Sequence, residues 1–341
     1  MKTLFKTLFI LIGVAVIAAF ACLYIVCSSE RVMQNVLMSS TNKFLEGMTV
    51  RDLVIKNQVC DLPRKFTFED VSLKLEQGEE TYAMSFRAVQ ISEVMSLICS
   101  GKGAVLQLKD GSVKASTFRL DGLDVKIVSK SMQKWGGGVS VKEAESNGFQ
   151  VRDIDAKTVI TSKDAAISGI NGDSYKGKVM GNAHVYFMPS VRYVADVKFE
   201  GLDTAEMEDV NLSLFSQVRG RIYGAIEVQG HAGGLENIHM NVGLNEDGEI
   251  QAKALEPLLA YIPKSIQKEN IKAAIKDNRR IPVNKAQVKL ADQGSETISA
   301  DIQLKSDDLN LDVNVTVDII IEGGLKSLLN YSSQISQFMK G

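Results

Sequence analysis

Apolar and polar residues alternate along most of this chain, and this period of two constrains the fold more than any other feature. In "LNLDVNVTVDIII", residues 309–321, apolar side chains take every second position and polar side chains take nearly all the others. Successive side chains of a β-strand point to opposite faces of a sheet, so such a stretch predicts a strand with one buried face. Short turns at Gly, Asn and Asp separate these stretches. We therefore predict a mainly β fold, a curved antiparallel sheet of roughly 16 to 20 strands shaped as an open groove or taco.

Two stretches change the phase of this alternation within a single strand. In "RKFTFEDVSLKL" the apolar positions are even-numbered up to Phe68 and odd-numbered afterwards. In "FRLDGLDVKIV" the same change follows Leu120. One inserted residue shifts every later side chain to the other face, so we predict a bulge or tight corner at Glu69–Asp70 and at Gly122.

The N-terminus carries a long apolar run. Leu8 to Val26 contains 19 residues without a charge, and Lys2 and Lys6 precede it. At about 1.5 Å per residue a helix of this length spans about 28 Å, close to the hydrocarbon thickness of a bilayer. The apolar run is longer than that of a cleaved signal peptide, so we predict a single uncleaved transmembrane helix. The preceding lysines place the N-terminus in the cytoplasm and the rest of the chain in the periplasm, anchored to the inner membrane.

The predicted organisation has four parts. Residues 1–27 form the cytoplasmic tip and anchor, 28–47 a juxtamembrane linker, 48–190 an N-terminal β-meander and 191–341 a C-terminal β module. Apolar residues at three- and four-residue spacing predict two amphipathic helices in the last part, around 256–277 and 324–340. Pro263 predicts a break or kink in the first of these helices.

Composition and motifs argue against several classes of function. Lys and Arg total 39 against 41 Asp and Glu, and aromatic residues make up 6% of the chain, so we expect no nucleic-acid partner. No C-x-x-C, G-x-S-x-G, H-E-x-x-H or P-loop pattern occurs. The glycine run after Trp135 has no following helix signal and is interpreted as a turn. We therefore predict no catalytic residue, no metal site and no cofactor. An envelope enzyme is the function that the sequence favours least.

Two of the four cysteines are candidates for a disulfide. Cys22 and Cys27 lie within or at the edge of the predicted anchor and are interpreted as small apolar residues. Cys60 and Cys99 would lie in an oxidising compartment. They can pair only if their strands are neighbours.

Glycines interrupt the strongest candidate for a binding surface. "VRGRIYGAIEVQG", residues 218–230, predicts one strand in which three glycines share the parity of the apolar residues. Glycine weakens a strand interior, so its repeated use has two explanations. The glycines permit bulges and twist, or their missing side chains leave an apolar trough that holds a chain-like ligand. The candidate lipid-groove residues are Val218, Gly220, Ile222, Gly224, Ile226, Val228 and Gly230.

The region around this stretch resembles the C-terminal module of the AsmA-like family, bacterial envelope proteins that include TamB and YdbH. The shared pattern is a strand ending in F-x-G-L-D, then G-x-I-x-G-x-I-x-V-x-G, then a short strand and G-x-I, over residues 193–321. The resemblance implies transfer of phospholipid or another envelope lipid, or a role in outer-membrane biogenesis, with acyl chains shielded in an apolar β-groove. The alternative is an envelope scaffold that binds protein partners through its β-sheet without lipid transport.

Overall fold

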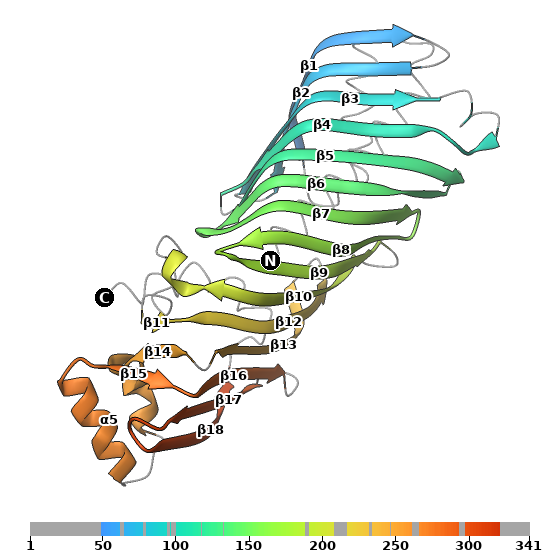
Figure 1. Ribbon diagram of the computed structural model, residues 1–341. Helices are drawn as coiled ribbons and strands as arrows, with labels where there is room; N and C mark the ends of the chain where they lie inside the picture. Colours follow the sequence, from blue (N-terminus) through green and yellow to red (C-terminus); the bar gives the residue numbers. More distant parts are fainter. Residues whose placement is uncertain are drawn as a thin grey trace. The chain divides into compact units, whose positions relative to one another are not determined.

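The computed structural model of the protein describes residues 49–61, 65–77, 80–93, 96, 100–116, 118–131, 133–187, 191–207, 217–231, 234–245, 247–260, 266–292 and 297–320. Strands dominate these residues (Figure 1). The elements are β1 (Thr49–Asp61), β2 (Lys65–Gln77), β3 (Glu80–Ser92), β4 (Val105–Lys114), β5 (Phe118–Ser131), β6 (Lys134–Ser146), β7 (Phe149–Thr161), β8 (Asp164–Ser174), β9 (Gly177–Tyr186), β10 (Arg192–Asp203), η1 (Thr204–Glu206), β11 (Val218–Arg219), β12 (Arg221–His231), β13 (Gly234–Leu244), β14 (Gly248–Gln251), η2 (Ala252–Ala260), α5 (Ile266–Lys276), β15 (Arg280–Val283), β16 (Lys285–Asp292), β17 (Thr297–Ser306) and β18 (Leu311–Ile320).

One large antiparallel sheet contains most of these strands. Its 15 strands hydrogen-bond in chain order from β1 to β10, then β12, β13, β16, β17 and β18. A second sheet of 3 strands has the order β11–β14–β15. The prediction of a mainly β, antiparallel fold is confirmed.

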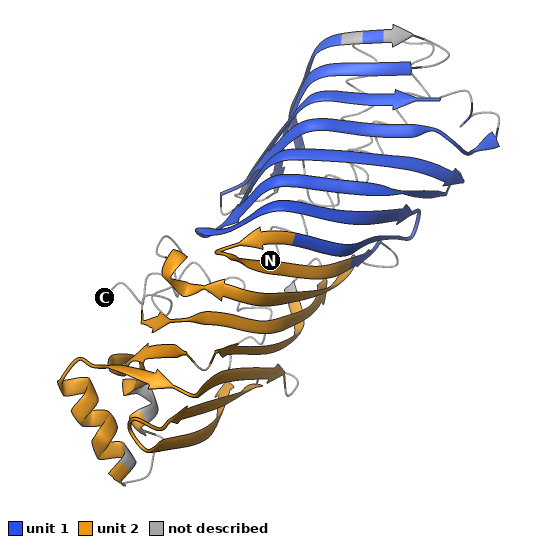
Figure 2. Ribbon diagram, in the orientation of Figure 1, with its two compact units in different colours: residues 1–171, 184–189 blue, residues 172–183, 190–341 orange. Residues whose placement is uncertain are grey.

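The chain divides into two compact units (Figure 2). Unit 1 takes the chain up to Asn171 together with 184–189, and unit 2 takes 172–183 and everything from Ser190. The division therefore falls within strands β8 and β9, whereas the sequence predicts a boundary between residues 190 and 191. Each unit is described separately below.

Residues with left-handed backbone lie in the middle of the long strands of unit 1, and Figure 1 shows these strands bending along their length. Asp70, Asp110 and Asp153 have φ of 48°, 49° and 49°, and Gly122 has 64°. This conformation is rare outside glycine, although Asp and Asn adopt it more readily than other residues. It is typical of a bulge, in which one extra residue reverses the alternation of the strand.

The buried side chains change parity at these bulges. In β2 the buried apolar residues are Phe66 and Phe68 before Asp70, and Val71, Leu73 and Leu75 after it. In β5, Phe118 is buried before Gly122, and Leu123 and Ile127 are buried after it. Both phase changes predicted from the sequence are confirmed. The pairing of β4 with β5 is irregular beside Gly122, as expected for a bulge. The register of β2 with β1 and β3 is the same before and after Asp70, so the change there is a corner that the neighbouring strands match.

Cationic side chains on the neighbouring strands flank the left-handed aspartates. In the register of β1 to β4, Arg87 lies between Asp70 and Asp110, and Lys56 lies on the other side of Asp70. Lys56 Nζ is 3.4 Å from Asp70 Oδ2, and both side chains are exposed. Such an exposed pair contributes little to stability, so the backbone conformation is the main reason for an aspartate at this position.

The core of unit 1 lies on the apolar face of these strands. Leu75, Tyr82 and Val113 have no exposed surface, and Phe86 is 2% exposed. The ring centroids of Phe66 and Phe68 are 4.6 Å apart in an edge-to-face arrangement. The buried residues form one continuous cluster that extends from β1 to β8, so the face is densely packed across much of the unit.

Unit 2 combines the later strands with the small sheet and the helical segments η1, η2 and α5. Its core joins β17 and β18 to the small sheet, η2 and α5. Helix α5 buries Ile271 and Ala274, which are 0% and 1% exposed. Asn270 on the same helix donates a hydrogen bond to the carbonyl oxygen of Leu309 at 3.1 Å, which holds the helix beside the turn before β18.

Three local predictions differ from the structure. The stretch 218–230 is not one strand, because Val218 belongs to β11 in the small sheet and β12 begins only at Arg221. The glycines after Trp135 form no turn but lie inside β6. The range 256–277 holds the end of η2 and then α5, whose described residues begin at Ile266.

Other predictions fall on residues outside the described part of the chain. These are the anchor at Leu8–Val26, the linker, the helix around 324–340 and Cys99. Cys60 lies on β1 opposite Phe66. Within the described residues, no helix combines the length and apolar character needed to cross a membrane.

The left-handed backbone at Asp70 provides a test of the bend. We expect Asp70→Val to lower the free energy of unfolding by about 1–2 kcal/mol, because a β-branched residue disfavours left-handed backbone. Asp70→Gly is the matched control, since it removes the same ion pair with Lys56 but accepts this conformation. Urea denaturation followed by circular dichroism measures both variants. Equal losses in the two variants would show that the carboxylate, not the backbone, stabilises the bend.

Candidate functional site

Two rows of apolar residues cross six strands of unit 2, from β10 to β18. Residues directly opposite each other in antiparallel strands share a face of the sheet, so the register defines each row. The first row is Val197, Ile226, Met240, Leu290, Ala300 and Val317. The second row is Phe199, Gly224, Val242, Val288, Ile302 and Val315. We call these two rows the apolar band.

Most of the apolar band is only partly buried. Within the band Ala300 and Val315 are buried, and the other ten residues keep part of their surface accessible. The opposite face of the same strands carries exposed side chains such as Lys198, Glu227 and Lys289. The sheet therefore has a polar face and an apolar face that is not fully covered.

The next row along the strands borders one side of the band and contains buried residues. Leu202, Ile222, Leu304 and Val313 are 2–8% exposed. Leu304 and Val313 belong to the cluster formed with η2, α5 and the small sheet, against which Val317 of the band also packs. These elements cover the apolar face beside the band and also the β18 end of the band, where Val315 belongs to the cluster.

Buried residues also lie on the other side of the band. Ala195 and Val228 are opposite each other and are 5% and 2% exposed. Tyr193 in the following row is 4% exposed. Burial, followed by the negative charge of Glu236, raises the pKa of the Tyr193 phenol. The phenol therefore stays neutral, and the apolar face carries no charge at this position.

The chemistry of the band is that of a hydrocarbon surface. Its twelve residues include no charged side chain, no hydroxyl and no amide. A surface of this kind provides no nucleophile or general base for catalysis. Among the described residues, no group of three or more His, Cys, Asp or Glu is arranged to hold a metal ion.

The predicted groove residues separate into three sets. Gly224 and Ile226 lie in the apolar band. Ile222, Val228 and Gly230 are buried beside it on β12. Val218 pairs with Ile250 in the small sheet, and Gly220 lies between the two strands. These seven residues therefore do not share one continuous face.

The structure gives a backbone reason for two of the glycines. A Cβ atom on Gly224 would lie 2.3 Å from the carbonyl oxygen of Asn241, so β13 approaches too closely for any side chain. Gly220 has φ of 132°, and a Cβ there would lie 2.9 Å from the Cα of Gly248. The sequence leaves two explanations open, bulges and twist or an apolar trough. At these two positions the glycine is instead required by close approach of another backbone segment and, at Gly220, by a positive φ.

We expect Gly224→Ala to lower the free energy of unfolding by about 1–3 kcal/mol, because the added methyl group forces β12 and β13 apart. Gly138→Ala in β6 is the control, since its Cβ would meet only the Ala156 carbonyl oxygen at 3.8 Å. Urea denaturation measures both variants. A Gly224→Ala protein as stable as the control would restore the explanation in which this glycine leaves open space.

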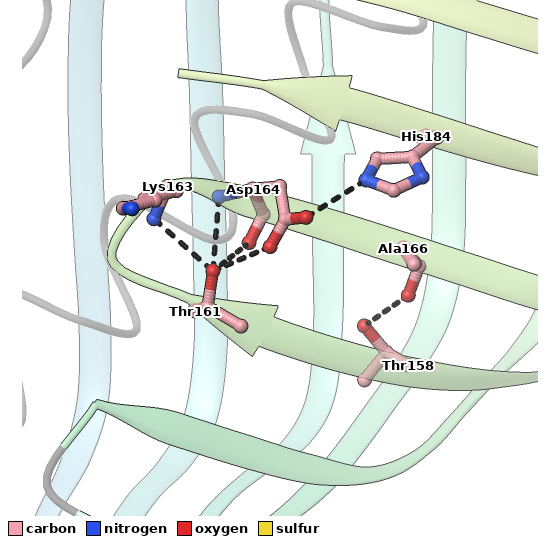
Figure 3. Close-up of polar contacts among 6 residues, drawn as sticks. All are labelled: Thr158, Thr161, Lys163, Asp164, Ala166 and His184. Atoms are coloured by element: carbon pink, nitrogen blue, oxygen red, sulfur yellow. Dashed lines mark hydrogen bonds and ion pairs between the residues drawn. The ribbon is translucent and has the colours of Figure 1, made fainter. Parts of the chain in front are cut away.

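A polar cluster joins the β7–β8 turn to β9 within unit 1 (Figure 3). The Thr161 hydroxyl accepts hydrogen bonds from the backbone N–H groups of Lys163 and Asp164, each at 3.1 Å, and donates to the Asp164 carboxylate. His184 Nε2 lies 3.1 Å from the other carboxylate oxygen of Asp164. The His184 ring stacks on Tyr186 with a centroid distance of 4.2 Å.

This cluster has the geometry of a structural turn. In a hydrolase triad the histidine lies between the hydroxyl and the carboxylate and removes the hydroxyl proton. In this cluster the carboxylate lies between Thr161 and His184. The Thr161 hydrogen bond, followed by His184, lowers the pKa of the Asp164 carboxyl against the opposing effect of burial. The cluster therefore favours the ionised carboxylate and closes the hairpin.

We expect Asp164→Asn to lower the free energy of unfolding by roughly 1 kcal/mol at neutral pH, because it loses charge-assisted hydrogen bonds. A pKa lowered by folding stabilises the protein above the unfolded pKa, and this contribution disappears as pH falls through the folded pKa. The difference from the parent protein should therefore vanish in acid. Asp155→Asn, at an exposed position of β7, is the control. A difference that persists unchanged in acid would contradict this account.

No family model, curated protein or solved structure matches this chain. The resemblance to the AsmA-like family therefore remains a prediction from the sequence.

Sequence reasoning identified one strand of the apolar band and missed the others. Met240, Leu290 and Ile302 lie far apart in the chain and become neighbours through the register of β13, β16 and β17. Each lies in a stretch that alternates clearly, so the sequence predicts a strand at each position but not which strands are neighbours. The sequence does not show that β13 pairs with β16, because the helical segments η2 and α5 lie between them in the chain.

Proposed function

We propose that this protein binds the acyl chain of a membrane phospholipid on the apolar band, as an inner-membrane protein of the periplasm that transfers envelope lipid or serves outer-membrane biogenesis. The observation that carries the proposal is the apolar band itself. It is a continuous, uncharged surface that the rest of unit 2 leaves partly uncovered. A folded protein buries such a surface unless another molecule covers it.

The length of the band supports an acyl chain as the occupant. Six strands span the band, and five spacings of about 4.8 Å give about 24 Å. One leaflet of a bilayer takes about half of the roughly 30 Å hydrocarbon core. An extended acyl chain therefore fits along the band across the strands. Each methylene group removed from water contributes about 0.8 kcal/mol, so even partial coverage stabilises the complex.

The chemistry of the band also defines what the protein distinguishes. A phospholipid headgroup is charged and strongly hydrated, and the band offers it no polar partner. The band therefore binds the tail while the headgroup remains in water. We infer binding that depends on chain length and is nearly independent of headgroup.

Sequence features outside the described residues support the proposed location. Lys2 and Lys6 precede the uncharged run from Leu8 to Val26, which favours an anchor with a cytoplasmic N-terminus. Such an anchor would place the β units at the bilayer from which the lipid is taken. The resemblance to AsmA-like proteins supports the same location.

A charge placed in the band tests lipid binding. We expect Met240→Glu to weaken binding of a fluorescent fatty acid at least tenfold, because the carboxylate must give up water beside the acyl chain. Asn241→Glu adds the same side chain at the next residue, which is exposed on the polar face opposite Ala225 and Lys289, and should bind like the parent protein. Fluorescence titration of the full-length protein in detergent measures both variants, with competition by phosphatidylethanolamine and phosphatidylglycerol of equal chain length.

Three results would contradict the proposal. Equal binding by Met240→Glu and the parent would remove the band as the site. Equal loss in the two variants would indicate unfolding or a general charge effect. Purified protein that carries no lipid but a stoichiometric protein partner would favour the scaffold alternative.

A further inference from the structure

The 15-stranded sheet ends in two edge strands that differ in their protection against pairing with another strand. An edge strand exposes unpaired backbone N–H and C=O groups, and proteins usually block such an edge with bulges and charges. Strand β1 has a register irregularity between Val50 and Asp52 and carries exposed Arg51 and Lys56. It is thus a protected edge.

Strand β18 has fewer of these devices, since the carboxylates of Asp312 and Asp318 are its only charges. It pairs with β17 over ten consecutive residues without an irregularity, and it contains no proline, no glycine and no cation. At its end Ile319 is 44% exposed and Ile320 is 74% exposed. A regular strand with exposed apolar residues is an open template for another strand.

We propose that β18 pairs with β18 of a second copy of this chain, antiparallel, around a twofold axis at Thr316. Antiparallel pairing keeps residues of equal parity opposite each other, so the faces of the two sheets match. This register places Asn314 opposite the partner subunit's Asp318, an amide beside a carboxylate. On the apolar face it places Val315 opposite the partner subunit's Val317.

The charges of the strand disfavour one neighbouring register, in which the twofold axis lies at Val315. A twofold axis at Val315 would place Asp312 opposite the partner subunit's Asp318, twice in the dimer. Like charges directly opposite each other destabilise a sheet. The axis at Thr316 avoids that pair and also covers Ile319 with the partner subunit's Val313. Ile319 faces an apolar residue of the partner subunit in either register, so the charges decide between the two.

The dimer also extends the apolar band. Val317 and Val315 end the two rows of the band in each copy. Pairing at β18 places them beside their symmetry mates on the same face, so two bands join into one surface of twice the length. This inference concerns assembly and holds whether or not a lipid binds.

Cysteine cross-linking tests the register. Thr316→Cys places two cysteines opposite each other at about 4.5–5.5 Å between Cβ atoms, within reach of a disulfide after a small shift. Asn314→Cys is the matched control on the same face, since its two copies lie four residues apart along the strand, about 14 Å. We expect oxidation of full-length protein in detergent to give at least fivefold more covalent dimer with Thr316→Cys. Equal cross-linking in both variants would overturn the register.

A second pair of variants tests the dimer without cysteine. Ile319→Lys places a charge opposite an apolar residue of the partner and should raise the dissociation constant at least tenfold. Asn314→Lys places a lysine opposite the partner subunit's Asp318 and should preserve the dimer. Light scattering after size-exclusion chromatography measures the mass of both, and circular dichroism checks folding. A parent protein that is monomeric at every concentration would overturn the proposal, while fatty-acid binding would be unaffected by that result.

Discussion

Backbone pairing between neighbouring strands decides which side chains of this protein share a face, and the rest of the structure depends on it. A shift of one residue in one strand would move its apolar set to the polar face. A change of parity in one strand must therefore be matched by its neighbours. Asp70 and Asp110 meet this requirement around the intervening strand β3, where the buried residues also change parity, from Phe86 to Val89. The bend of unit 1 therefore depends on matching changes of parity in several neighbouring strands.

Much of this arrangement could be predicted from the sequence, because the alternation within each strand shows which of its residues share a face. The change after Phe68 is visible as two runs of opposite parity, and the residue between them is an aspartate, which adopts left-handed backbone more readily than most residues. Gly122 gives the same signal in β5. A one-sided antiparallel sheet follows from these local patterns without knowledge of which strands pair.

The remaining features could not be predicted because they depend on contacts between strands. Gly137 and Gly224 both belong to glycine-containing stretches, yet neither is in a turn or beside a gap. A Cβ on Gly137 would collide with the carbonyl oxygen of Lys126, and one on Gly224 with that of Asn241. A glycine is compatible with a turn, a void or a close backbone approach, and only the position of the neighbouring strand distinguishes them. The split of 218–230 at Gly220 was hidden for the same reason, since alternation continues across it.

The partial exposure of the apolar band has a cost that bears on its role. Buried residues lie on both sides of it, and the helix α5 and the small sheet already cover the adjoining part of the same face. Extending that cover by one row would bury more apolar surface and stabilise unit 2. Surfaces that forgo such stabilisation are typical of sites completed by another molecule. An acyl chain along the rows and a second copy at β18 cover different parts of this surface, one its face and the other its edge, so the two do not compete.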